Sequence, residues 1–592
     1  MKIAKVTLSL GLEREFDYLL GEDLNPKIGS RLLVDFRGKK QLGILTGIHA
    51  ASRIQKIKPV IDVLDSEPAL SGENIVFAEK LSTYYPYALS EFLFMMLPKY
   101  LRTLKKTSLN ATPEPESSGI SKKTFIKASD FKTRYENWRE LIKEKLKTGS
   151  VLVIFPQVSF LLEARKIIEK DFADTKILHS YESEKELFQS WVSTREKSLI
   201  LGTRVALFYY PKDLALLVIE EESSPYYFQE EKPFYHLFDL VMLLADIKKI
   251  DIIFSANYPS LYAYNLIKQK EIELIDEETQ KLQVKVVSVG EHRHQLISPL
   301  LVEFLQKHIA SGKRAVILWN KTGFGSYLAC SSCGYIFQCP SCSGFMKLSL
   351  IKNKGVCPHC GKERDIPKTC QLCNNGYIKS SGMGTERIEL LLRRIFPDAK
   401  IAEWEKRQPD TQIVIATSKI IGSIYAEEKF DNGFLLDADY QMSRLDYEAT
   451  FDTYLYIQNL SRMFKESVYI FTRNKSHYLF ELINAGWTKM YEKELSLRYE
   501  LALPPFGTIA KIILRSPKES TLLKHTINLL QRFKDKNLEV YGPFKEQPYK
   551  LRSKFRYSVI LKSKDSGALR YVVKETVRDF RTSSLQAAVI VR

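Results

Sequence analysis

The feature that most constrains this chain is the placement of its cysteines. All eight lie between Cys330 and Cys373, and the rest of the 592 residues contain none. They form four C-x-x-C pairs, Cys330/Cys333, Cys339/Cys342, Cys357/Cys360 and Cys370/Cys373. Each pair can direct two thiolates at one metal ion, so eight thiolates satisfy two tetrahedral four-cysteine zinc sites with none left over. We therefore expect a compact module with two structural Zn²⁺ ions, although spacing alone does not decide which pairs share an ion.

The role and location of this metal follow from the same pattern. A four-thiolate site leaves no open position for water, so we expect the zinc to be architectural and not catalytic. Confinement of every cysteine to one block is unlike the disulfide pattern of a secreted protein. The segment Met1 to Glu15 lacks a signal-peptide pattern, and no run approaches the roughly 18 uncharged apolar residues of a membrane helix. These observations predict a cytoplasmic protein with no membrane partner.

The charge of the chain points to a polyanionic partner. It carries 88 Lys and Arg against 70 Asp and Glu, a formal net charge of +18. Such an excess favours nucleic acid as a partner, and a basic surface that serves only solubility is the alternative. With 45% hydrophobic residues the composition is globular, and the length predicts several domains.

Short apolar strands and helical patterns predict a multidomain α/β fold. A small β-rich domain comes first, and a Pro- and Ser-rich linker follows it. Two later series of strands alternate with helices, which is typical of parallel sheets, and the cysteine block interrupts the second series. The expected segments are a β-rich domain at 1–101, a linker at 102–123, a first lobe at 124–274, a second lobe at 275–328 and 379–490, the cysteine module at 329–378 and an α+β domain at 491–592.

Several short motifs carry a family resemblance. Two of them flank the cysteine block, Asn-Lys-Thr-Gly-Phe at 320–324 and Gly-Met-Gly-Thr-Glu-Arg at 382–387. The others are Leu-His-Ser at 178–180, Gly-Thr-Arg at 202–204, Pro-Phe-Tyr-His at 233–236, Leu-Asp-Ala-Asp at 436–439 and Leu-Pro-Pro-Phe at 503–506. Through these motifs the chain resembles the bacterial primosomal protein N′ family of replication-restart proteins over nearly its whole length.

The resemblance implies a superfamily 2 helicase that binds stalled or rebuilt forks and recruits the machinery that loads the replicative helicase. It implies a 3′-end-binding domain, a winged helix, two RecA-like lobes, a zinc module in the second lobe and a C-terminal DNA-binding domain. It also implies a nested pairing, with Cys330, Cys333, Cys370 and Cys373 on one ion and the other four cysteines on the second. The winged helix has no room here, because only the linker at 102–123 stands in its place. We therefore expect recognition of the lagging-strand arm to be weaker or altered.

The sequence departs from this family at the nucleotide-binding loop. Phosphate binding needs glycines, whose backbone N–H groups can wrap the phosphates, followed by Lys and Ser or Thr. The matching segment, 126–133, reads Ile-Lys-Ala-Ser-Asp-Phe-Lys-Thr and has neither glycine. Lys132 and Thr133 survive, but Asp130 and Phe131 would oppose the phosphate electrostatically and sterically. An ordinary helix start is the simpler interpretation of this Lys-Thr pair.

The other nucleotide-dependent motifs are degraded as well. The family's Asp-Glu-Glu-His appears as Glu-Glu-Glu-Ser at 220–223. Glu220 and Glu221 keep carboxylates that could hold Mg²⁺, but the coupling His is lost. The arginine-finger segment at 458–465 keeps Arg462 and lacks its glycines. Because these parts act as one unit, their joint decay predicts no ATP turnover, and we do not expect ATP or Mg²⁺ as a cofactor.

Residues for DNA binding are better preserved at the N-terminus. The resemblance implies that Phe16, Asp17, Gly38 and Lys58 hold the 3′-terminal nucleotide of a leading strand. Their chemistry fits stacking, hydrogen bonding, close backbone approach and phosphate attraction. A core Phe, a turn Asp, an ordinary loop Gly and a solvated Lys are the alternatives.

The C-terminal region carries a basic cluster with aromatic residues between its cations. Such a mixture can follow phosphates while it stacks bases. The alternative is a strand whose aromatic side chains face the core while its cations are solvated. The cations expected to bind DNA are Lys550, Arg552, Lys554 and Arg556.

Three functions follow from these patterns. The favoured one is a replication-restart protein that binds branched DNA and recruits primosome and helicase-loading proteins without helicase activity of its own. The alternatives are a divergent ATP-dependent 3′-to-5′ DNA helicase and a repurposed zinc-containing nucleic-acid-binding protein. Fork-stimulated ATP hydrolysis separates the helicase from the others. Preference for forks with a free 3′ end separates restart from the repurposed role.

Overall fold

The structure is a computed structural model in which the described residues form two compact units. The first contains Met1–Thr279, Asp565–Glu575 and Val589–Arg592, and the second contains Gln280–Lys564 and Thr576–Ala588. Among the described residues, no helix combines the length and the apolar character needed to cross a membrane. The structure describes every residue except 1, 12–13, 53, 55, 110–120, 278–281, 290–296, 320–326, 334, 342–344, 350–353, 358–359, 382–384, 419, 421–427, 445, 535, 537 and 579–585.

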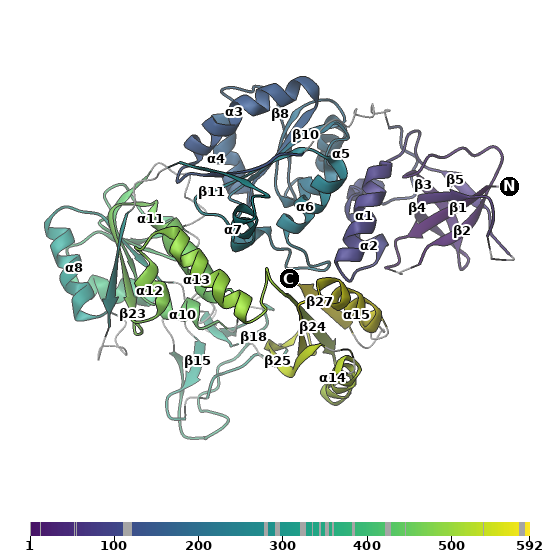
Figure 1. Cartoon of the computed structure of the whole chain (residues 1–592). Coiled ribbons are helices and arrows are strands. Elements are labelled where there is room, and N and C mark those ends of the chain that lie inside the picture. The colour runs from purple at the N-terminus through teal and green to yellow at the C-terminus, as the bar shows by residue number, and fades with distance from the viewer. Residues whose placement is uncertain are drawn as a thin grey trace. The chain divides into compact units, whose positions relative to one another are not determined.

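The N-terminal domain is an antiparallel sheet of order β2-β1-β4-β3-β5 with two helices beside it (Figure 1). Ala4, Val6 and Leu8 of β1 face its core, as the period of two along a strand requires. Arg37 and Gly38 form the two-residue turn between β3 and β4 and have φ angles of 52° and 80°. The elements are β1 Lys2–Leu8, β2 Phe16–Leu20, β3 Arg31–Phe36, β4 Lys39–His49, β5 Val60–Val63, α1 Gly72–Tyr84 and α2 Leu89–Met95.

A buried arginine ties the start of the expected linker to this domain. Arg31 is fully buried, and its guanidinium forms an ion pair with Asp65 at 2.6 Å. The same guanidinium donates to the carbonyl oxygens of Leu101, Thr103 and Lys105 at 2.5, 3.2 and 3.2 Å. Burial of a guanidinium requires that its donors be satisfied, so this part of the chain packs on the sheet.

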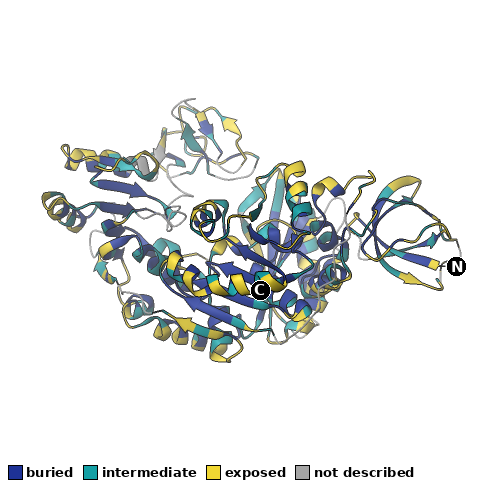
Figure 2. Cartoon of the chain, turned by 90° about the horizontal axis from the view of Figure 1, so that it is seen from above, coloured by how far each residue is buried: buried dark blue, intermediate teal, exposed yellow. Residues whose placement is uncertain are grey.

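The first lobe is a parallel sheet of order β12-β6-β11-β10-β7-β9-β8 flanked by helices (Figure 1). Every residue of β7 and β9 is buried, which explains their continuous apolar runs. Figure 2 shows sheet strands coloured dark blue for buried and exposed residues in yellow on the helices. The elements are β6 Lys123–Lys127, α3 Phe131–Thr148, β7 Ser150–Ile154, α4 Val158–Ile168, β8 Thr175–Leu178, α5 Glu184–Ser193, β9 Leu199–Gly202, β10 Leu214–Glu220, α6 Leu237–Lys248, β11 Asp251–Ala256, α7 Leu261–Lys268 and β12 Glu273–Asp276.

The second lobe is also a parallel sheet, of order β13-β23-β22-β14-β21-β20. Ile317, Ile415 and Phe434 of its central strands are buried in one core. The elements are β13 Gln283–Ser288, α8 Pro299–Ala310, β14 Ala315–Leu318, α9 Thr385–Ile395, β20 Ile401–Glu403, β21 Ile413–Ala416, β22 Phe430–Leu435, α10 Ala438–Met442, α11 Ala449–Ser461, β23 Phe464–Thr472, α12 Tyr478–Leu482 and α13 Trp487–Glu500.

The cysteine module interrupts the second lobe between β14 and α9 and consists of two small antiparallel sheets. Its strands are β15 Tyr327–Cys330, β16 Lys347–Ser349, β17 Lys354–Val356, β18 Glu363–Arg364 and β19 Ile378–Ser381. Short 3₁₀ helices complete the chain at Lys99–Leu101, Arg204–Tyr209, Pro225–Tyr227 and Trp404–Lys406.

The C-terminal region is a sheet of order β25-β26-β24-β27 with two helices. Strands β25 and β26 form a long antiparallel hairpin whose register shifts twice, between Tyr541 and Phe544 and between Lys545 and Lys550. The elements are β24 Thr508–Ser516, α14 Glu519–Lys534, β25 Glu539–Leu551, β26 Lys554–Ser563, α15 Ser566–Arg578 and β27 Gln586–Val591.

The expected fold class is confirmed. A β-rich N-terminal domain, two parallel-sheet lobes, an inserted cysteine module and an α+β C-terminal region follow one another in the predicted order. The alternation of apolar strands and helices was sufficient for this prediction, because central parallel strands such as β7, β9 and β21 are buried on both faces and each needs a crossover before the next.

Candidate metal centres, remnant nucleotide site and nucleic-acid interfaces

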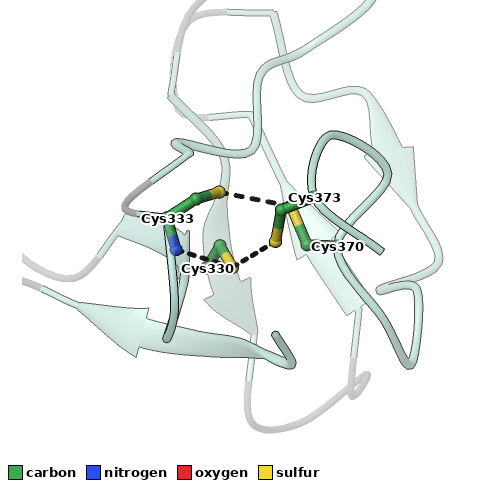
Figure 3. Close-up of side chains that lie close together, drawn as sticks. All are labelled: Cys330, Cys333, Cys370 and Cys373. Atoms are coloured by element: carbon green, nitrogen blue, oxygen red, sulfur yellow. Dashed lines mark hydrogen bonds between the residues drawn. The ribbon is translucent and has the colours of Figure 1, made fainter. Parts of the chain in front are cut away.

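Four cysteines from the two ends of the module converge at one point. Cys330 ends β15, and Cys370 and Cys373 precede β19 (Figure 3). The Sγ atoms of these three and of Cys333 all lie within 4.8 Å of one another. The distance from Cys330 to Cys373 is 3.6 Å, and that from Cys333 to Cys370 is 3.8 Å. Four thiolates about 2.3 Å from a zinc ion form a tetrahedron with edges of about 3.8 Å, so this arrangement fits that ion.

The backbone around this cluster favours thiolates. The N–H of Cys333 donates to the Sγ of Cys330 at 3.5 Å. The N–H groups of Asn375 and Gly376 lower the pKa of Cys373 to about 6. A Cβ at Gly376 would lie 2.4 Å from the Sγ of Cys330, so only glycine fits there. The C-x-x-C spacing identified the ligands but gave no signal for this glycine.

A second cluster lies in the same module. The Sγ atoms of Cys339, Cys357 and Cys360 lie within 4.8 Å of one another, with 3.6 Å between those of Cys339 and Cys360. Cys342, the fourth expected ligand, lies outside the described residues. The two clusters follow the nested grouping. Each could hold a zinc ion, the second with three described thiolates.

The segment 126–133, compared above with a phosphate-binding loop, runs from the end of β6 into α3, and the Asp130 side chain caps that helix. Asp130 Oδ1 accepts the backbone N–H of Thr133 at 2.9 Å, and Thr133 Oγ1 donates to Asp130 Oδ2 at 2.8 Å. A carboxylate thus stands at the helix N-terminus, where a nucleotide phosphate would bind. Lys132 is exposed. The Lys-Thr pair therefore lies in the first turn of a helix, as the simpler interpretation predicted.

The acidic pair at the end of β10 is occupied by an arginine. Arg134 of α3 is fully buried and forms ion pairs with Glu220 at 2.6 Å and Glu221 at 2.8 Å. Its remaining Nη1 donates to the carbonyl oxygen of Ala128 at 2.7 Å. A guanidinium therefore supplies the positive charge that Mg²⁺ would otherwise supply to these carboxylates. The sequence analysis missed Arg134, because an arginine in a helix gives no signal of its burial.

The third glutamate of this segment is used by the following helix. Glu222 accepts the backbone N–H and the hydroxyl of Ser260, the N-cap of α7, at 2.8 and 2.6 Å. Burial raises the pKa of Glu222 to about 7. In the second unit, Arg462 lies half-buried at the C-cap of α11.

At the N-terminal domain, aromatic rings bring two strands together. The ring centroid of Phe16 on β2 lies 5.0 Å from that of Phe36 on β3, and the Arg14 guanidinium lies 5.0 Å from the Phe16 ring. Phe16 is half-buried against the core. Asp17 follows it on the strand and accepts a hydrogen bond from the Ser52 hydroxyl.

One carboxylate links the other two expected residues. Asp35 accepts a hydrogen bond from the Lys58 ammonium and another, at 3.2 Å, from the Gly38 N–H. The Lys58 hydrogen bond holds the pKa of Asp35 below its usual value. Asp35 therefore joins Gly38 to Lys58, whereas Phe16 contacts Phe36, which packs against the core of the domain. Arg14, Asp35 and Phe36 were not foreseen, since their roles depend on contacts between strands.

In the C-terminal hairpin, the basic residues divide into two groups. Lys550 lies 4.7 Å from the Phe555 ring centroid, and Arg552 is exposed at the turn. Lys554, next to the turn, is half-buried. Arg556, in contrast, is only 8% exposed and donates to the carbonyl oxygen of Pro548 at 3.1 Å. Arg556 begins a run of four buried residues on β26, which the count of cations could not show.

Comparison with known proteins gives matches at both ends of the chain and along its length. Residues 5–98 match a family model described as the 3′ DNA-binding domain of PriA, and residues 499–592 match the primosomal protein N C-terminal domain. The chain is 24% identical to the replication restart protein PriA of Rickettsia felis, over 95% of this chain and 94% of that protein. It is 23% identical to that of Haemophilus influenzae, over 99% and 98%.

A solved structure of RecG bound to a three-way DNA junction matches 64% of this chain and 44% of that one, with 10% identity and a TM-score of 0.35. The sequence matches are stronger evidence of similarity, because they extend over the two terminal domains and the lobes alike. They show that the chain is similar, over nearly its whole length, to replication restart proteins named PriA.

Proposed function

We propose that the chain is a replication-restart protein that binds branched DNA at a free 3′ end, and that it does so without turning over ATP. The observation that carries this proposal is the match of residues 5–98 to a 3′ DNA-binding domain. Two features of this domain support it, the Phe16–Phe36 ring pair and the turn at which Gly38 and Lys58 share Asp35. These residues offer an aromatic ring that can stack on a base, a glycine turn that lets DNA approach the backbone closely, and a cation that can attract phosphate.

Asp17 supplies a different kind of contact in this proposal. Its carboxylate accepts a hydrogen bond from the Ser52 hydroxyl. Because a carboxylate has several acceptor sites, it can also act as a directional acceptor for a terminal 3′-hydroxyl. A carboxylate has no attraction for phosphate. It therefore contributes to recognition of the strand end and not to general affinity for DNA.

The C-terminal hairpin supplies the general affinity. Lys550 and the exposed Arg552 lie at the turn end of the hairpin and can neutralise backbone phosphates. Tyr541 and Phe544 are 45% and 46% exposed on the same edge strand, β25, and offer faces on which bases can stack. Arg556 belongs to the interior of the domain in this proposal.

The first lobe acts as a scaffold. Its helix N-terminus is capped by Asp130, and its acidic pair holds Arg134, so the groups that would bind Mg-ATP are already engaged. Displacement of Arg134 by a metal ion would leave a buried guanidinium without its ion-pair partners. The proposal therefore excludes the helicase function, and leaves to partner proteins the loading of the replicative helicase.

The two cysteine clusters hold architectural zinc ions in this proposal. When bound, each ion supplies no more than a tetrahedral crosslink among thiolates. The chain's own residues do the rest, since the N–H groups of Cys333, Asn375 and Gly376 stabilise the thiolate form.

Mg-ATP should neither stabilise the protein nor be hydrolysed. Saturating Mg-ATP stabilises a protein that binds it in the folded state alone, so an unchanged melting temperature with and without Mg-ATP is expected. Forked DNA should stimulate no phosphate release. A DNA-dependent ATPase that Lys132→Ala abolishes would contradict this prediction and favour the divergent helicase.

Arg134→Ala should destabilise the chain strongly, because it leaves Glu220 and Glu221 as unpaired buried carboxylates. The expected loss in the free energy of unfolding of the first lobe is about 3–5 kcal/mol. Arg139→Ala on the same helix is the matched control, since its side chain is 35% exposed and its ion pairs should contribute about 0–1 kcal/mol. Denaturant melts of both variants measure the difference. Equal losses would show that Arg134 is not a buried anchor.

Asp17→Ala should reduce the preference for a fork with a free 3′-hydroxyl over one with a blocked end by about three- to tenfold, as expected for one hydrogen bond. Lys550→Ala with Arg552→Ala should instead weaken all DNA structures alike and lower the salt slope of log K by about 2. Titrations against both forks at several salt concentrations measure these effects. Glu22→Ala, which removes an exposed carboxylate of the same domain, is the control. If free and blocked ends bind equally and Asp17→Ala has no effect, the restart role of this domain is wrong.

Metal analysis of freshly reduced protein should find two zinc ions per chain, and double variants test their pairing. Cys330→Ser with Cys370→Ser should leave one zinc, because both residues belong to one nested site. Cys330→Ser with Cys339→Ser should leave none, because each removes a ligand from a different site. The reverse result would indicate sequential pairing.

A further inference from the structure

The turn of the C-terminal hairpin lies against the cysteine module within the second unit. The backbone N–H of Ser553, at the turn between β25 and β26, donates to the carbonyl oxygen of Ser341 at 3.0 Å. Ser341 stands inside the second C-x-x-C pair, two residues after Cys339. The hairpin and the module are therefore joined at a metal knuckle, although more than two hundred residues separate them in the sequence.

An apolar contact accompanies this hydrogen bond. Leu551, the last residue of β25, packs against a small buried core of the module. That core is formed by Leu328, Phe337, Cys339, Met346 and Cys357. Two of its five members are thus cysteines of the second cluster, so the core that receives Leu551 is continuous with the candidate metal site.

The conformation of the turn also depends on this contact. Arg552 and Ser553 have φ angles of 49° and 62°, in the left-handed region that residues other than glycine rarely adopt. A two-residue hairpin turn of this kind usually takes Asn or Gly. Arg552 and Ser553 disfavour this turn conformation. The hydrogen bond from Ser553 to Ser341 and the packing of Leu551 stabilise it from the two ends of the turn.

We propose that the second cysteine cluster holds the turn of the DNA-binding hairpin in place. Metal in this cluster fixes Cys339 and Cys357 in the core, the core holds Leu551, and the docked turn presents Arg552 to a nucleic-acid phosphate. Loss of that metal releases the turn and weakens DNA binding, although no cysteine touches DNA. The inference rests on the proposed DNA-binding role of the hairpin, and it assigns a task to one of the two metal sites.

Hydrogen exchange of the full-length chain, with and without a zinc chelator, tests whether the cluster holds the turn. This test needs no DNA. Chelation should speed exchange at the Ser553 amide by about tenfold, the loss expected for one hydrogen bond. Leu551→Ala should exchange fast at Ser553 while both zinc ions are bound, and chelation should add little. Val540→Ala, a truncation near the other end of β25, should behave as the unaltered chain does. Exchange in β21 serves as an internal control for the fold of the lobe.

A Ser553 amide that stays protected after chelation would overturn the proposal. So would a Leu551→Ala variant that responds to the chelator as strongly as the unaltered chain, because the coupling would then bypass Leu551. A zinc content below two in Leu551→Ala would show that the side chain supports the metal site itself, and would equally contradict the proposed direction of the effect.

Affinity for forked DNA distinguishes this proposal from the function on which it rests. Chelation and Leu551→Ala should weaken binding by the same factor, and the two together should be no worse than either alone. Lys550→Ala with Arg552→Ala keeps the docked turn and removes its cations. If that variant binds DNA as the unaltered chain does, the DNA-binding role of the hairpin fails, while the exchange experiment still decides whether the metal holds the turn.

Discussion

The buried guanidinium of Arg134 is the interaction on which the first lobe depends at its nucleotide-binding end. It joins the carbonyl oxygen of Ala128 after β6 to the carboxylates of Glu220 and Glu221 at the end of β10. Its Nε, Nη1 and Nη2 atoms donate to groups that would otherwise be buried and unpaired, so the lobe reaches a closed arrangement without a ligand. In a nucleotide-binding lobe of this type those groups would await a metal ion and a phosphate. Here the chain supplies both charges, the cation from Arg134 and the anion from Asp130.

The cysteine module depends on a constraint of a different kind. Among the described residues its apolar core has five buried members, two of them cysteines, which is too few to hold a fold by burial alone. In the proposed function, zinc crosslinks would make up for this small core, as in other small zinc modules. The same core contacts Leu551, so the proposed metal site would also position the distant hairpin. On this proposal the chain keeps the residues for DNA binding and folding, while its own side chains fill the positions where a nucleotide would bind.

Predictions from the sequence succeeded where a pattern is local. The spacing of eight cysteines identified two clusters, and the alternation of short apolar runs with helices predicted parallel sheets, whose strands Ser150–Ile154 and Ile413–Ala416 are fully buried. The same reasoning could not separate Arg556 from Arg552, because both are cations near one turn. The register of β26 buries Arg556 and leaves Arg552 exposed. A residue's type was visible, but the face on which it lies was not.

The sequence by itself determined the fold class, the metal-binding chemistry and the loss of the phosphate-binding glycines, because each depends on residue type and spacing along the chain. Only the tertiary structure decided what fills the remnant site, which carboxylate joins Gly38 to Lys58, and where the hairpin turn rests. Arg134 and Glu220, Asp35 and Lys58, and Ser553 and Ser341 are each far apart in the sequence. Their contacts exist because strand order and register bring them together, and neither is written in any local stretch of residues.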